Sequence, residues 1–200
     1  MRQKTESRRQ AFIEVARGVF DEFGFEAASM SEIAARVGGS KATLYSYFPS
    51  KEELFLAVVR SVAENHLRTT FGDLDAGRSV RENLLLFSER FIRLLASNEI
   101  INSHRYLVGE AGKSSVGRLF YEQGPRVGQD ETSRFLATAM GKGELRKSDP
   151  EIAAKQLVAL CKAEHFEERL LAVREELSEA EVREMAARAV DLFMRGYAPD

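Results

Sequence analysis

Two glycines and a proline divide residues 29–54 into short helical segments, and this spacing constrains the fold more than any other feature of the chain. Ser29-Met-Ser-Glu32 has the pattern of a capping box, in which the serine hydroxyl accepts from the glutamate amide and the carboxylate reaches back. Gly38-Gly39 can adopt backbone angles forbidden to other residues, so the pair breaks a helix sharply. We therefore expect a short helix that ends at about Val37.

A second short helix is predicted directly after the glycine pair. Ser40 can cap it, and it carries Lys41–Tyr47 until Pro49, which disfavours helical geometry at Phe48. Ser50-Lys-Glu-Glu53 is another capping box and predicts the start of a long helix. The two short helices are therefore separated by a tight turn and followed by a longer one.

Apolar residues at three-and-four spacing place a longer helix on each side of this pair. The first covers about Ser7–Phe23 and ends at Gly24, and the other covers about 51–67. Their apolar stripes are Phe12, Val15, Ala16, Val19, Phe20 and Phe23, and Leu54, Phe55, Val58, Val59 and Val62. Two short helices braced in this way make a helix-turn-helix unit, whose second short helix is expected to enter a major groove.

Hydroxyl groups and cations are concentrated on that second short helix, as they are on helices that read DNA. We expect Lys41 and Thr43, near its start, to contact base edges. Phosphate contacts are expected from Tyr45, Ser46, Tyr47 and Lys51, with further contacts from Ser40 and from backbone amides at the helix starts around Ser29, Met30 and Lys51. A packing module with core tyrosines is the alternative; it accounts for Leu44 and Phe48 but not for the polar positions.

Charge is distributed unevenly along the chain, although the total is nearly balanced. The 29 Lys and Arg against 31 Asp and Glu exclude a uniformly basic coat. Residues 1–51 nevertheless carry eight Lys or Arg against six Asp or Glu. A mildly basic first segment on an acidic remainder is typical of a protein that contacts a polyanion at one end only.

Residues 8–60 or so resemble the N-terminal domain of TetR-type transcriptional regulators. The family's pattern T/S-x-x-x-I-A is met by Ser29–Ala34, its T-L/I-Y-x-Y/H-F by Thr43–Phe48, and its S-K-E-x-L by Ser50–Leu54. The resemblance implies a DNA-binding transcriptional regulator. Because one short reading helix is too little for specific affinity, we expect a homodimer on a palindromic operator, acting as a repressor.

The turn between the short helices departs from the family pattern. Where the family has Ala-Gly-Val, this chain has Val37-Gly38-Gly39. Gly39 lacks the aliphatic side chain that would pack between the two helices. The departure predicts a looser turn.

After Asn65 the chain is again predicted to be helical. Amphipathic segments cover about 80–97, 100–109, 116–141, 150–173 and 179–196. The expected fold is therefore all-α, with a helix-turn-helix DNA-binding domain over residues 1–52, a linking helix over about 51–67, and an effector-binding and dimerisation domain over 68–200. The segment Ile152–Ala163 is apolar nearly all round, which predicts burial on two sides, one of them against a partner subunit.

This second part also resembles the C-terminal domain of AefR-like members of the TetR family. The resemblance is carried by FYEQGP at 120–125, GELRKSDPEIAAKQL at 143–157 and AVDLFMRGYA at 189–198. It implies a helical effector-sensing domain that dimerises through its last two main helices.

Large aromatic side chains in the second part predict an effector pocket, because three amphipathic helices need fewer rings to pack on one another. Apolar walls with a few polar groups are typical of small-molecule sites. The candidate residues are Phe87, Phe91, Leu94, Arg105, Tyr106, Glu110, Phe120, Tyr121, Phe135 and His165. The expected ligand is a small, mostly apolar organic molecule, since metal-ligand clusters and phosphate-binding loops are not found in the sequence. Core filling by these rings is the alternative.

Other function classes have little support in the sequence. No Gly-x-Ser-x-Gly or His-Glu-x-x-His motif is present, so we expect no enzyme, no cofactor and no metal site. Glu164, His165 and Glu168 are spaced as ligands could be, but a salt-bridged surface is the stronger interpretation. The single cysteine, Cys161, and the lack of a long apolar run predict a cytoplasmic protein without membrane contact. A helical scaffold or adaptor that does not bind DNA remains the competing class.

Overall fold

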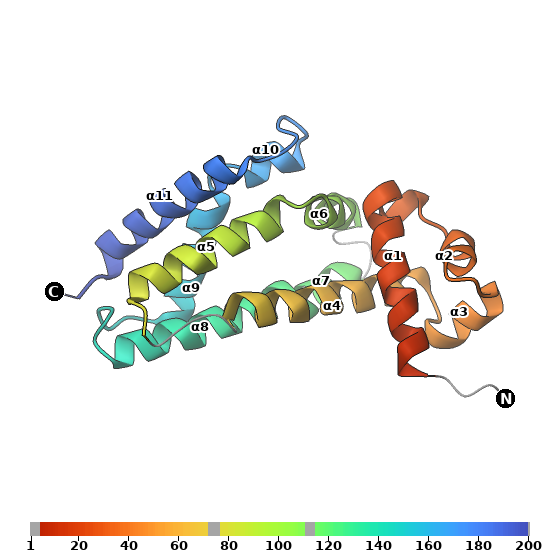
Figure 1. Ribbon diagram of the computed structural model, residues 1–200, viewed down its shortest axis with the longest axis horizontal. Coiled ribbons are helices and arrows are strands. Elements are labelled where there is room, and N and C mark those ends of the chain that lie inside the picture. The colour runs from red at the N-terminus through yellow and green to blue at the C-terminus, as the bar shows by residue number, and fades with distance from the viewer. Residues whose placement is uncertain (1–4, 72–76, 111–114, 200) are drawn as a thin grey trace. The chain divides into compact units, whose positions relative to one another are not determined.

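The computed structural model describes residues 5–71, 77–110 and 115–199, and in these ranges the regular structure is α-helix (Figure 1). The all-α prediction is therefore confirmed. The helices are α1 (Glu6–Ala27), α2 (Met30–Arg36), α3 (Lys41–Tyr47), α4 (Lys51–Phe71), α5 (Val80–Ala96), α6 (Asn98–Glu110), α7 (Val116–Gln123), α8 (Pro125–Gly141), α9 (Pro150–Lys162), α10 (Phe166–Leu170) and α11 (Glu179–Tyr197).

Contacts group the helices into two compact units. The first unit contains α1–α3, α4 up to Glu64, and the segment Asn98–Gly124 with α6 and α7. The second unit contains the remainder of α4 from Asn65, together with α5 and α8–α11. Two helices that the sequence places well beyond the N-terminal domain thus pack with it, because α6 lies against α1. The functional boundary at residue 68 stays a prediction.

Aromatic rings dominate the core of the first unit. The Phe55 ring meets those of Phe20, Phe25 and Tyr106 edge-on, with centroids 5.7, 5.1 and 5.6 Å away, and stacks on Phe120 at 6.5 Å. Offset and edge-to-face pairs at such distances stabilise a core beyond simple burial. The predicted apolar stripe of the first helix is largely buried in this core, while Phe23 is 45% exposed.

Gly24 ends the regular part of α1 as the sequence predicted. Its φ is 73°, in the left-handed region, and the chain makes a further helical turn to Ala27 before the capping residue Ala28. The second unit also matches the predicted starts at Val80, Pro150 and Glu179. Starts are well predicted here because each depends on a local capping residue: Ser79, Asp149 and Ser178 accept backbone hydrogen bonds at these helices.

Two long segments expected to be continuous are each broken into two helices. The predicted helix over 116–141 is α7 and α8, separated at Gly124, whose φ of −121° and ψ of −87° are not helical. A Cβ at Gly124 would lie 3.2 Å from Val59 Cγ1 and 3.3 Å from the Phe120 carbonyl oxygen. Close packing therefore favours a glycine at this position, and Pro125 disfavours helical geometry at the residue before it, which explains the break. The Gly-Pro pair is a local signal for this break, and the prediction missed it because the apolar spacing continues across it.

The predicted helix over 150–173 is likewise α9 and α10, with a turn at residues 163–165. His165 is 1% exposed, and its Nε2 lies 3.1 Å from the Cys161 carbonyl oxygen of the preceding turn. This buried contact with the end of α9 is a tertiary feature that periodicity does not reveal.

Small residues bring the helices of the second unit close together. In Figure 1, α11 runs alongside α5, and α9 contacts α5, α8 and α11. The buried alanines at these contacts are Ala139, Ala153, Ala154, Ala186 and Ala189. The unit also buries polar side chains, namely Asn83, Ser88, Thr132, His165 and Arg169.

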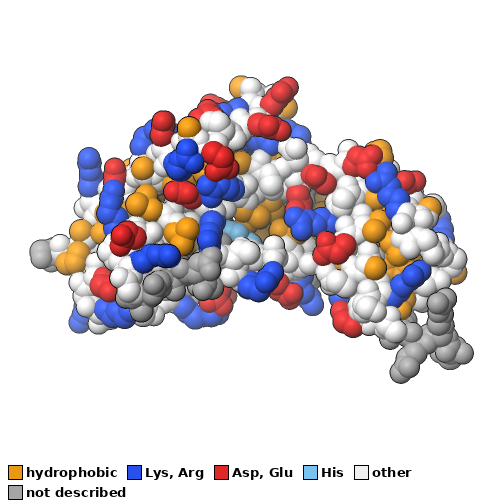
Figure 2. Space-filling view, in the orientation of Figure 1, with side chains coloured by type: hydrophobic (Ala, Val, Ile, Leu, Met, Phe, Trp, Pro, Cys, Tyr) orange, Lys and Arg blue, Asp and Glu red, His pale blue; other side chains and the backbone are white. Residues whose placement is uncertain are grey.

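Charged side chains of both signs are spread over the face of the molecule drawn in Figure 2. Figure 2 shows Lys and Arg interspersed with Asp and Glu over the face drawn, in agreement with the net charge of −2. Of the described helices, none combines the length and the apolar character needed to cross a bilayer.

Candidate nucleic-acid interface

The turn between α2 and α3 is closed by the glycine pair. Gly38 has φ 71° and donates from its amide to the Ala35 carbonyl oxygen at 3.0 Å, and the Gly39 amide donates to Ala34 at 2.9 Å. These two bonds are those of a Schellman motif, in which a residue with positive φ satisfies the last carbonyls of a helix. The predicted break at the glycine pair is confirmed, and Ser40 starts α3 directly after it.

Helix α3 has one buried and one exposed face. Leu44 is fully buried and the following Phe48 is 3% exposed, which ties the helix to the core of the first unit. Lys41, Tyr45 and Ser46 are exposed, and Tyr45 keeps 41% of its surface in contact with solvent. The polar residues predicted to contact DNA therefore lie on the exposed face of the helix, while the apolar residues anchor its other face in the core.

Several predicted DNA contacts already have partners within the chain. The Ser40 hydroxyl accepts from the Thr43 amide at 3.1 Å, so it caps α3. Ser46 donates from its hydroxyl to the Thr43 carbonyl oxygen at 2.7 Å, and the Tyr47 hydroxyl accepts from the Thr5 amide at 3.1 Å. These hydrogen bonds orient the hydroxyl groups before any ligand arrives. Each hydroxyl still has a lone pair or a proton with which it can bind a ligand.

Lys51 has a different environment from the one expected of a phosphate contact. Its Nζ donates to the carbonyl oxygens of Phe25, Glu26 and Ala28, at 2.8, 3.2 and 3.1 Å. An ammonium group has three protons, so these bonds account for its whole donor capacity. Lys51 therefore ties the start of α4 to the end of α1.

The start of α2 has only half of the predicted capping box. The Ser29 hydroxyl accepts from the Glu32 amide at 3.1 Å, but the Glu32 carboxylate pairs with Arg36 at 2.7 Å. Arg36 also pairs with Glu22 at 2.6 Å, and the hydrogen bond to Glu22 is the main reason why its pKa is raised. Met30 is 5% exposed, so its side chain cannot reach a ligand at this end of the helix.

The predicted effector residues are divided between the two units. Phe87, Phe91 and Phe135 pack in the core of the second unit, and the Phe87 and Phe91 rings stack with centroids 5.4 Å apart. Tyr106 and Phe120 belong to the core of the first unit, where Tyr106 stacks on Phe25 at 3.8 Å. These rings are therefore part of two separate cores, so the core-filling alternative describes Phe87 and Phe120 well.

The remaining candidates are scattered over both units. Arg105 is exposed and donates to the Asn102 side chain at 3.2 Å, and Tyr121 is 47% exposed. Leu94 is partly buried on α5 and His165 is fully buried. The side chain of Glu110 lies outside the described residues.

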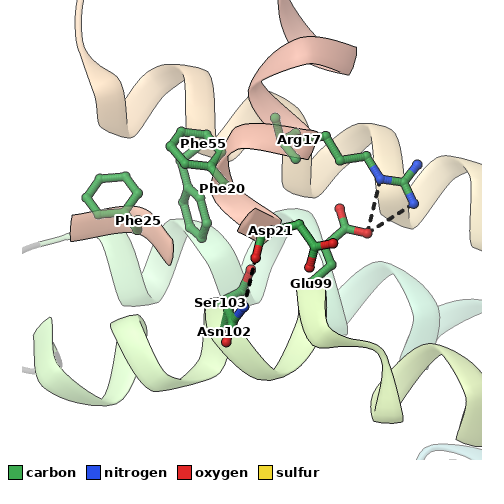
Figure 3. A pocket seen from close by; sticks show the side chains of 9 residues that line it. Arg17, Phe20, Asp21, Phe25, Phe55, Glu99, Asn102 and Ser103 are labelled. Carbon is green, nitrogen blue, oxygen red and sulfur yellow. Dashed lines mark hydrogen bonds and ion pairs between the residues drawn. The ribbon is translucent and has the colours of Figure 1, made fainter. Parts of the chain in front are cut away.

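A hollow in the first unit lies between α1, α4 and α6 (Figure 3). Arg17 pairs with Glu99 across it at 3.0 Å, and Asn102 donates to the Asp21 carbonyl oxygen at 3.2 Å. Burial raises the pKa of Glu99, although the charge of Arg17 opposes the shift. The space is about 10 Å³, which is about the room that one water molecule needs and far below that of an organic ligand.

Sequence reasoning gave no role to His66, on the part of α4 that belongs to the second unit. Its ring lies 5.8 Å from that of Phe91, and burial followed by the charge of Arg90 lowers its pKa to about 4. The imidazole is therefore neutral at pH 7. A lone histidine on an amphipathic helix carries no sequence signal that would distinguish it from a surface residue.

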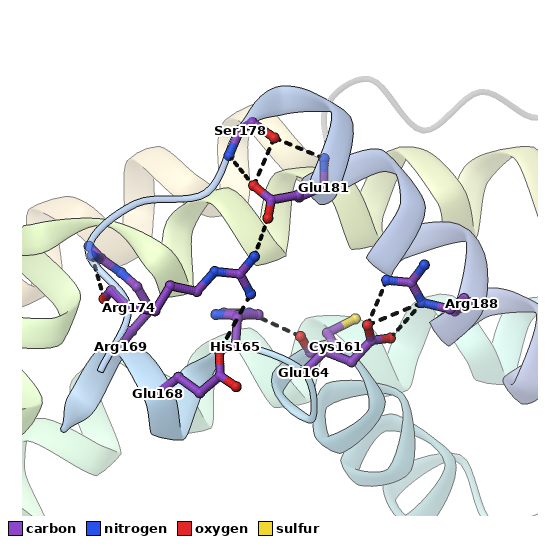
Figure 4. Close-up of polar contacts among 9 residues, drawn as sticks. All are labelled: Cys161, Glu164, His165, Glu168, Arg169, Arg174, Ser178, Glu181 and Arg188. Carbon is purple, nitrogen blue, oxygen red and sulfur yellow. Dashed lines mark hydrogen bonds and ion pairs between the residues drawn. The ribbon is translucent and has the colours of Figure 1, made fainter. Parts of the chain in front are cut away.

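The carboxylates around His165 are salt-bridged, as the stronger interpretation of the sequence held (Figure 4). Glu164 pairs with Arg188 at 2.6 Å and Glu168 with Arg174 at 3.5 Å. Burial lowers the pKa of His165. Over the described part of the chain, no three His, Cys, Asp or Glu residues are placed to hold a metal ion.

Comparison with known proteins covers both parts of the chain. Residues 82–199 match the family model of the AefR-like transcriptional repressor, C-terminal domain. Residues 12–58 match that of bacterial regulatory proteins, tetR family. The HTH-type transcriptional regulator YezE of Bacillus subtilis (strain 168) is 26% identical over 141 residues, which are 68% of this chain and 72% of YezE.

Solved structures of other proteins are similar to this chain over nearly its whole length. A TetR-family transcriptional regulator from Mesorhizobium loti MAFF303099 superposes with a TM-score of 0.87 and 26% identity, covering 98% of this chain and 100% of that one. The flavonoid-responsive regulator FrrA superposes with a TM-score of 0.72 and 30% identity, covering 98% and 99%. The all-helical fold is therefore shared with these proteins over nearly all of this chain.

Proposed function

The chain belongs to the TetR family of DNA-binding transcriptional regulators, and from this premise we propose that it is a ligand-responsive repressor that binds a palindromic operator as a homodimer. One observation carries the proposal: α3 exposes Lys41, Tyr45 and Ser46 on one side, while Leu44 fixes the other side in the core. Such a helix can enter a major groove without losing its support.

We propose that the start of α3 reads bases and the rest of the helix holds phosphates. Lys41 is exposed near the start of the helix, with its Nζ 5.8 Å from the Tyr45 ring centre, and from this position its long side chain would reach a base edge together with Thr43. Tyr45, Ser46 and Tyr47 would hold phosphates, with the helix starts at Ser29, Met30 and Ser40 beside them. For Lys51, whose donors are satisfied by carbonyl groups, we propose that the contact comes through the α4 backbone amides.

Dimerisation is proposed to use α9 and α11. Ile152 on α9 and Leu192 on α11 are 44% and 56% exposed, although each belongs to a helix whose other faces are packed. Large apolar side chains left in solvent on neighbouring helices are typical of a surface that a partner covers. A two-fold dimer would place two α3 helices over the two half-sites of a palindrome.

The proposed effector is a mostly apolar, planar organic molecule sensed by the second domain, residues 68–200. Two observations support this class: the Phe91 ring, which is only partly buried and lies 5.8 Å from the ring of the neutral His66, and the 30% identity with a flavonoid-responsive regulator over 98% of the chain. A ligand of this kind acts by binding one dimer conformation better than the other. The helix over about 51–67 links the DNA-binding residues 1–52 to that domain.

Selection of bound fragments from genomic DNA, followed by mobility shifts, tests the DNA-binding part. We expect a palindromic sequence, and sedimentation of the protein without DNA should give about twice the 22.4 kDa chain mass. Lys41→Ala should change which bases are preferred. Arg118→Ala, which removes a 71% exposed cation on α7, is the matched control and should leave the preference unchanged. Failure to enrich any sequence would favour the scaffold or adaptor class.

Thermal shift with planar aromatic compounds and with linear aliphatic ones of similar hydrophobicity tests the effector. We expect the planar compounds to raise Tm and to release the selected DNA. Phe91→Ala should weaken both effects while leaving DNA binding without ligand intact. Release by the aliphatic set alone would overturn the planar class but not the DNA-binding proposal.

A further inference from the structure

Arg8 occupies the space that the glycine at position 39 leaves open. A Cβ placed on Gly39 would lie 2.9 Å from Arg8 Nη2, and the next nearest atoms, on Ala34 and Phe12, are 3.9 Å away. The guanidinium also donates to the Gly38 carbonyl oxygen at 3.4 Å and lies 5.5 Å from the Phe12 ring centre. A side chain from the first turn of α1 thus packs where the family's aliphatic residue would pack.

Within the ranges that the structure describes, no carboxylate pairs with Arg8, in contrast to Arg17 and Arg36 of the same unit. Arg17 pairs with Glu99, and Arg36 pairs with two glutamates. Among the described residues, the interactions of the Arg8 guanidinium are those with Gly38 and Phe12. Its positive charge is therefore available to a ligand from outside the chain.

That charge lies at one end of the proposed reading helix. Gly38 and Gly39 directly precede Ser40, the capping residue of α3. In a helix-turn-helix unit the recognition helix enters the major groove by its N-terminal residues and the helix before it crosses the DNA backbone, so backbone phosphates are expected near the turn between the two helices. A guanidinium presents several N–H donors in a fork that matches the oxygens of a phosphate.

We propose that Arg8 closes the helix-turn-helix turn in place of the side chain missing at Gly39 and that it also contacts a DNA backbone phosphate next to the start of α3. The inference rests on the proposed placement of α3 in the major groove. It assigns two separable tasks to one side chain: packing by the body of the guanidinium on the turn, and neutralisation of one phosphate by its charge.

A valine at position 39 separates the two tasks. The φ of Gly39 is outside the left-handed region, so a side chain there is free of backbone strain. Three variants are compared with the wild type: Arg8→Met, which keeps an apolar stem but removes the charge, Gly39→Val, and the double variant. Arg118→Met serves as the control for losing one exposed cation of the first unit elsewhere.

We expect Arg8→Met to lower Tm by about 2–4 °C, the shift of about 1 kcal/mol in a chain of this size. It should also weaken binding to the selected DNA uniformly across sequences and reduce the slope of log K against log salt by about 1. In the double variant the valine should restore Tm, while the salt slope should stay reduced. Arg118→Met should change neither quantity.

Each outcome decides one part of the inference. An unchanged salt slope in Arg8→Met, with wild-type protein that binds DNA, overturns the phosphate contact and leaves the proposed function intact. A double variant no more stable than Arg8→Met overturns the packing role. Wild-type protein that binds no DNA overturns the proposed function and the phosphate contact together, while the Tm comparison still decides the packing role.

Discussion

The two units of this protein stabilise their cores by different means. The first unit interlocks large rings, with Phe55 in contact with four other aromatic side chains. The second brings helices together over alanines, and all the polar or charged residues buried among the described part of the chain, such as Ser88, His165 and Arg169, belong to it. The first core therefore depends on the volume of a few side chains, and the second on the close approach of its helices and on buried hydrogen bonds such as that from Arg169 to the Ala96 carbonyl oxygen.

This difference suits the proposed division of labour. A reading helix of seven residues, α3, needs a rigid support, and a dense aromatic core supplies it through Leu44 and Phe48. A domain that senses a ligand must have two packings of similar free energy.

Phe55→Ala is expected to give the largest effect. Removing a ring that is 2% exposed and meets four others should lower the free energy of unfolding by about 3–5 kcal/mol, because the cavity cannot be refilled by the neighbouring rings. Urea denaturation measures the loss. The control is Phe23→Ala, whose ring is 45% exposed. Equal losses in the two variants would show that the first core is not organised around Phe55.

An increase in side-chain volume, the opposite of the change at Phe55, should destabilise the second unit. Ala186→Leu adds volume at a fully buried position of α11, where the helix meets α5 and α9, and should cost about 1–3 kcal/mol through overpacking. Ala187→Leu, at the neighbouring half-buried position, is the matched control and should cost less. If Ala186→Leu were neutral in the same denaturation experiment, the alanine contacts would not set the helix spacing.

Arg169 tests the buried hydrogen bonds of the second unit. It is 6% exposed, and its guanidinium donates to the Ala96 carbonyl oxygen at 2.8 Å and to that of Arg174 at 3.3 Å. Arg169→Met should destabilise the protein by about 1–3 kcal/mol, because the carbonyl oxygens of two partly buried residues lose their donor. Arg188→Met, which removes an exposed ion pair, should cost less than about 1 kcal/mol. A larger loss of stability in Arg188→Met than in Arg169→Met would show that the buried hydrogen bonds of Arg169 do not stabilise the second unit.

The smallest expected effect is a pH dependence of opposite sign in the two units. Burial raises the pKa of Glu99 in the first unit, so between the ordinary and the raised value the folded chain holds a proton that the unfolded chain has released. Its contribution to stability therefore falls as pH rises through that window. In the second unit the pKa of His66 is lowered to about 4, so its contribution falls as pH drops from the ordinary value toward 4.

Unfolding midpoints in urea at several pH values measure both contributions. Glu99→Gln should flatten the dependence that Glu99 causes, and His66→Asn should flatten the part between the ordinary histidine pKa and 4. Each variant should leave the other contribution unchanged, because the two residues lie in separate units. A single variant that removed both would show that the units titrate together.

Local signals in the sequence determined much of this protein. Gly38 with its positive φ, the caps Ser29 and Ser40, and Pro49 placed α2 and α3 correctly, because each acts on the backbone within a few residues of itself. The periodicity of apolar residues gave the all-α class and the buried face of α3. The exposed polar face of α3 followed from the same periodicity.

Only the tertiary structure decided the features that join residues far apart in the chain. Helices α6 and α7 pack with the N-terminal helices, and the aromatic residues predicted to line an effector pocket are divided between two cores. The Lys51 ammonium group donates to carbonyl oxygens at the end of α1. Arg8 fills the gap at Gly39. Side-chain spacing reports which face of a helix is apolar, but it holds no information on which distant segment will cover that face.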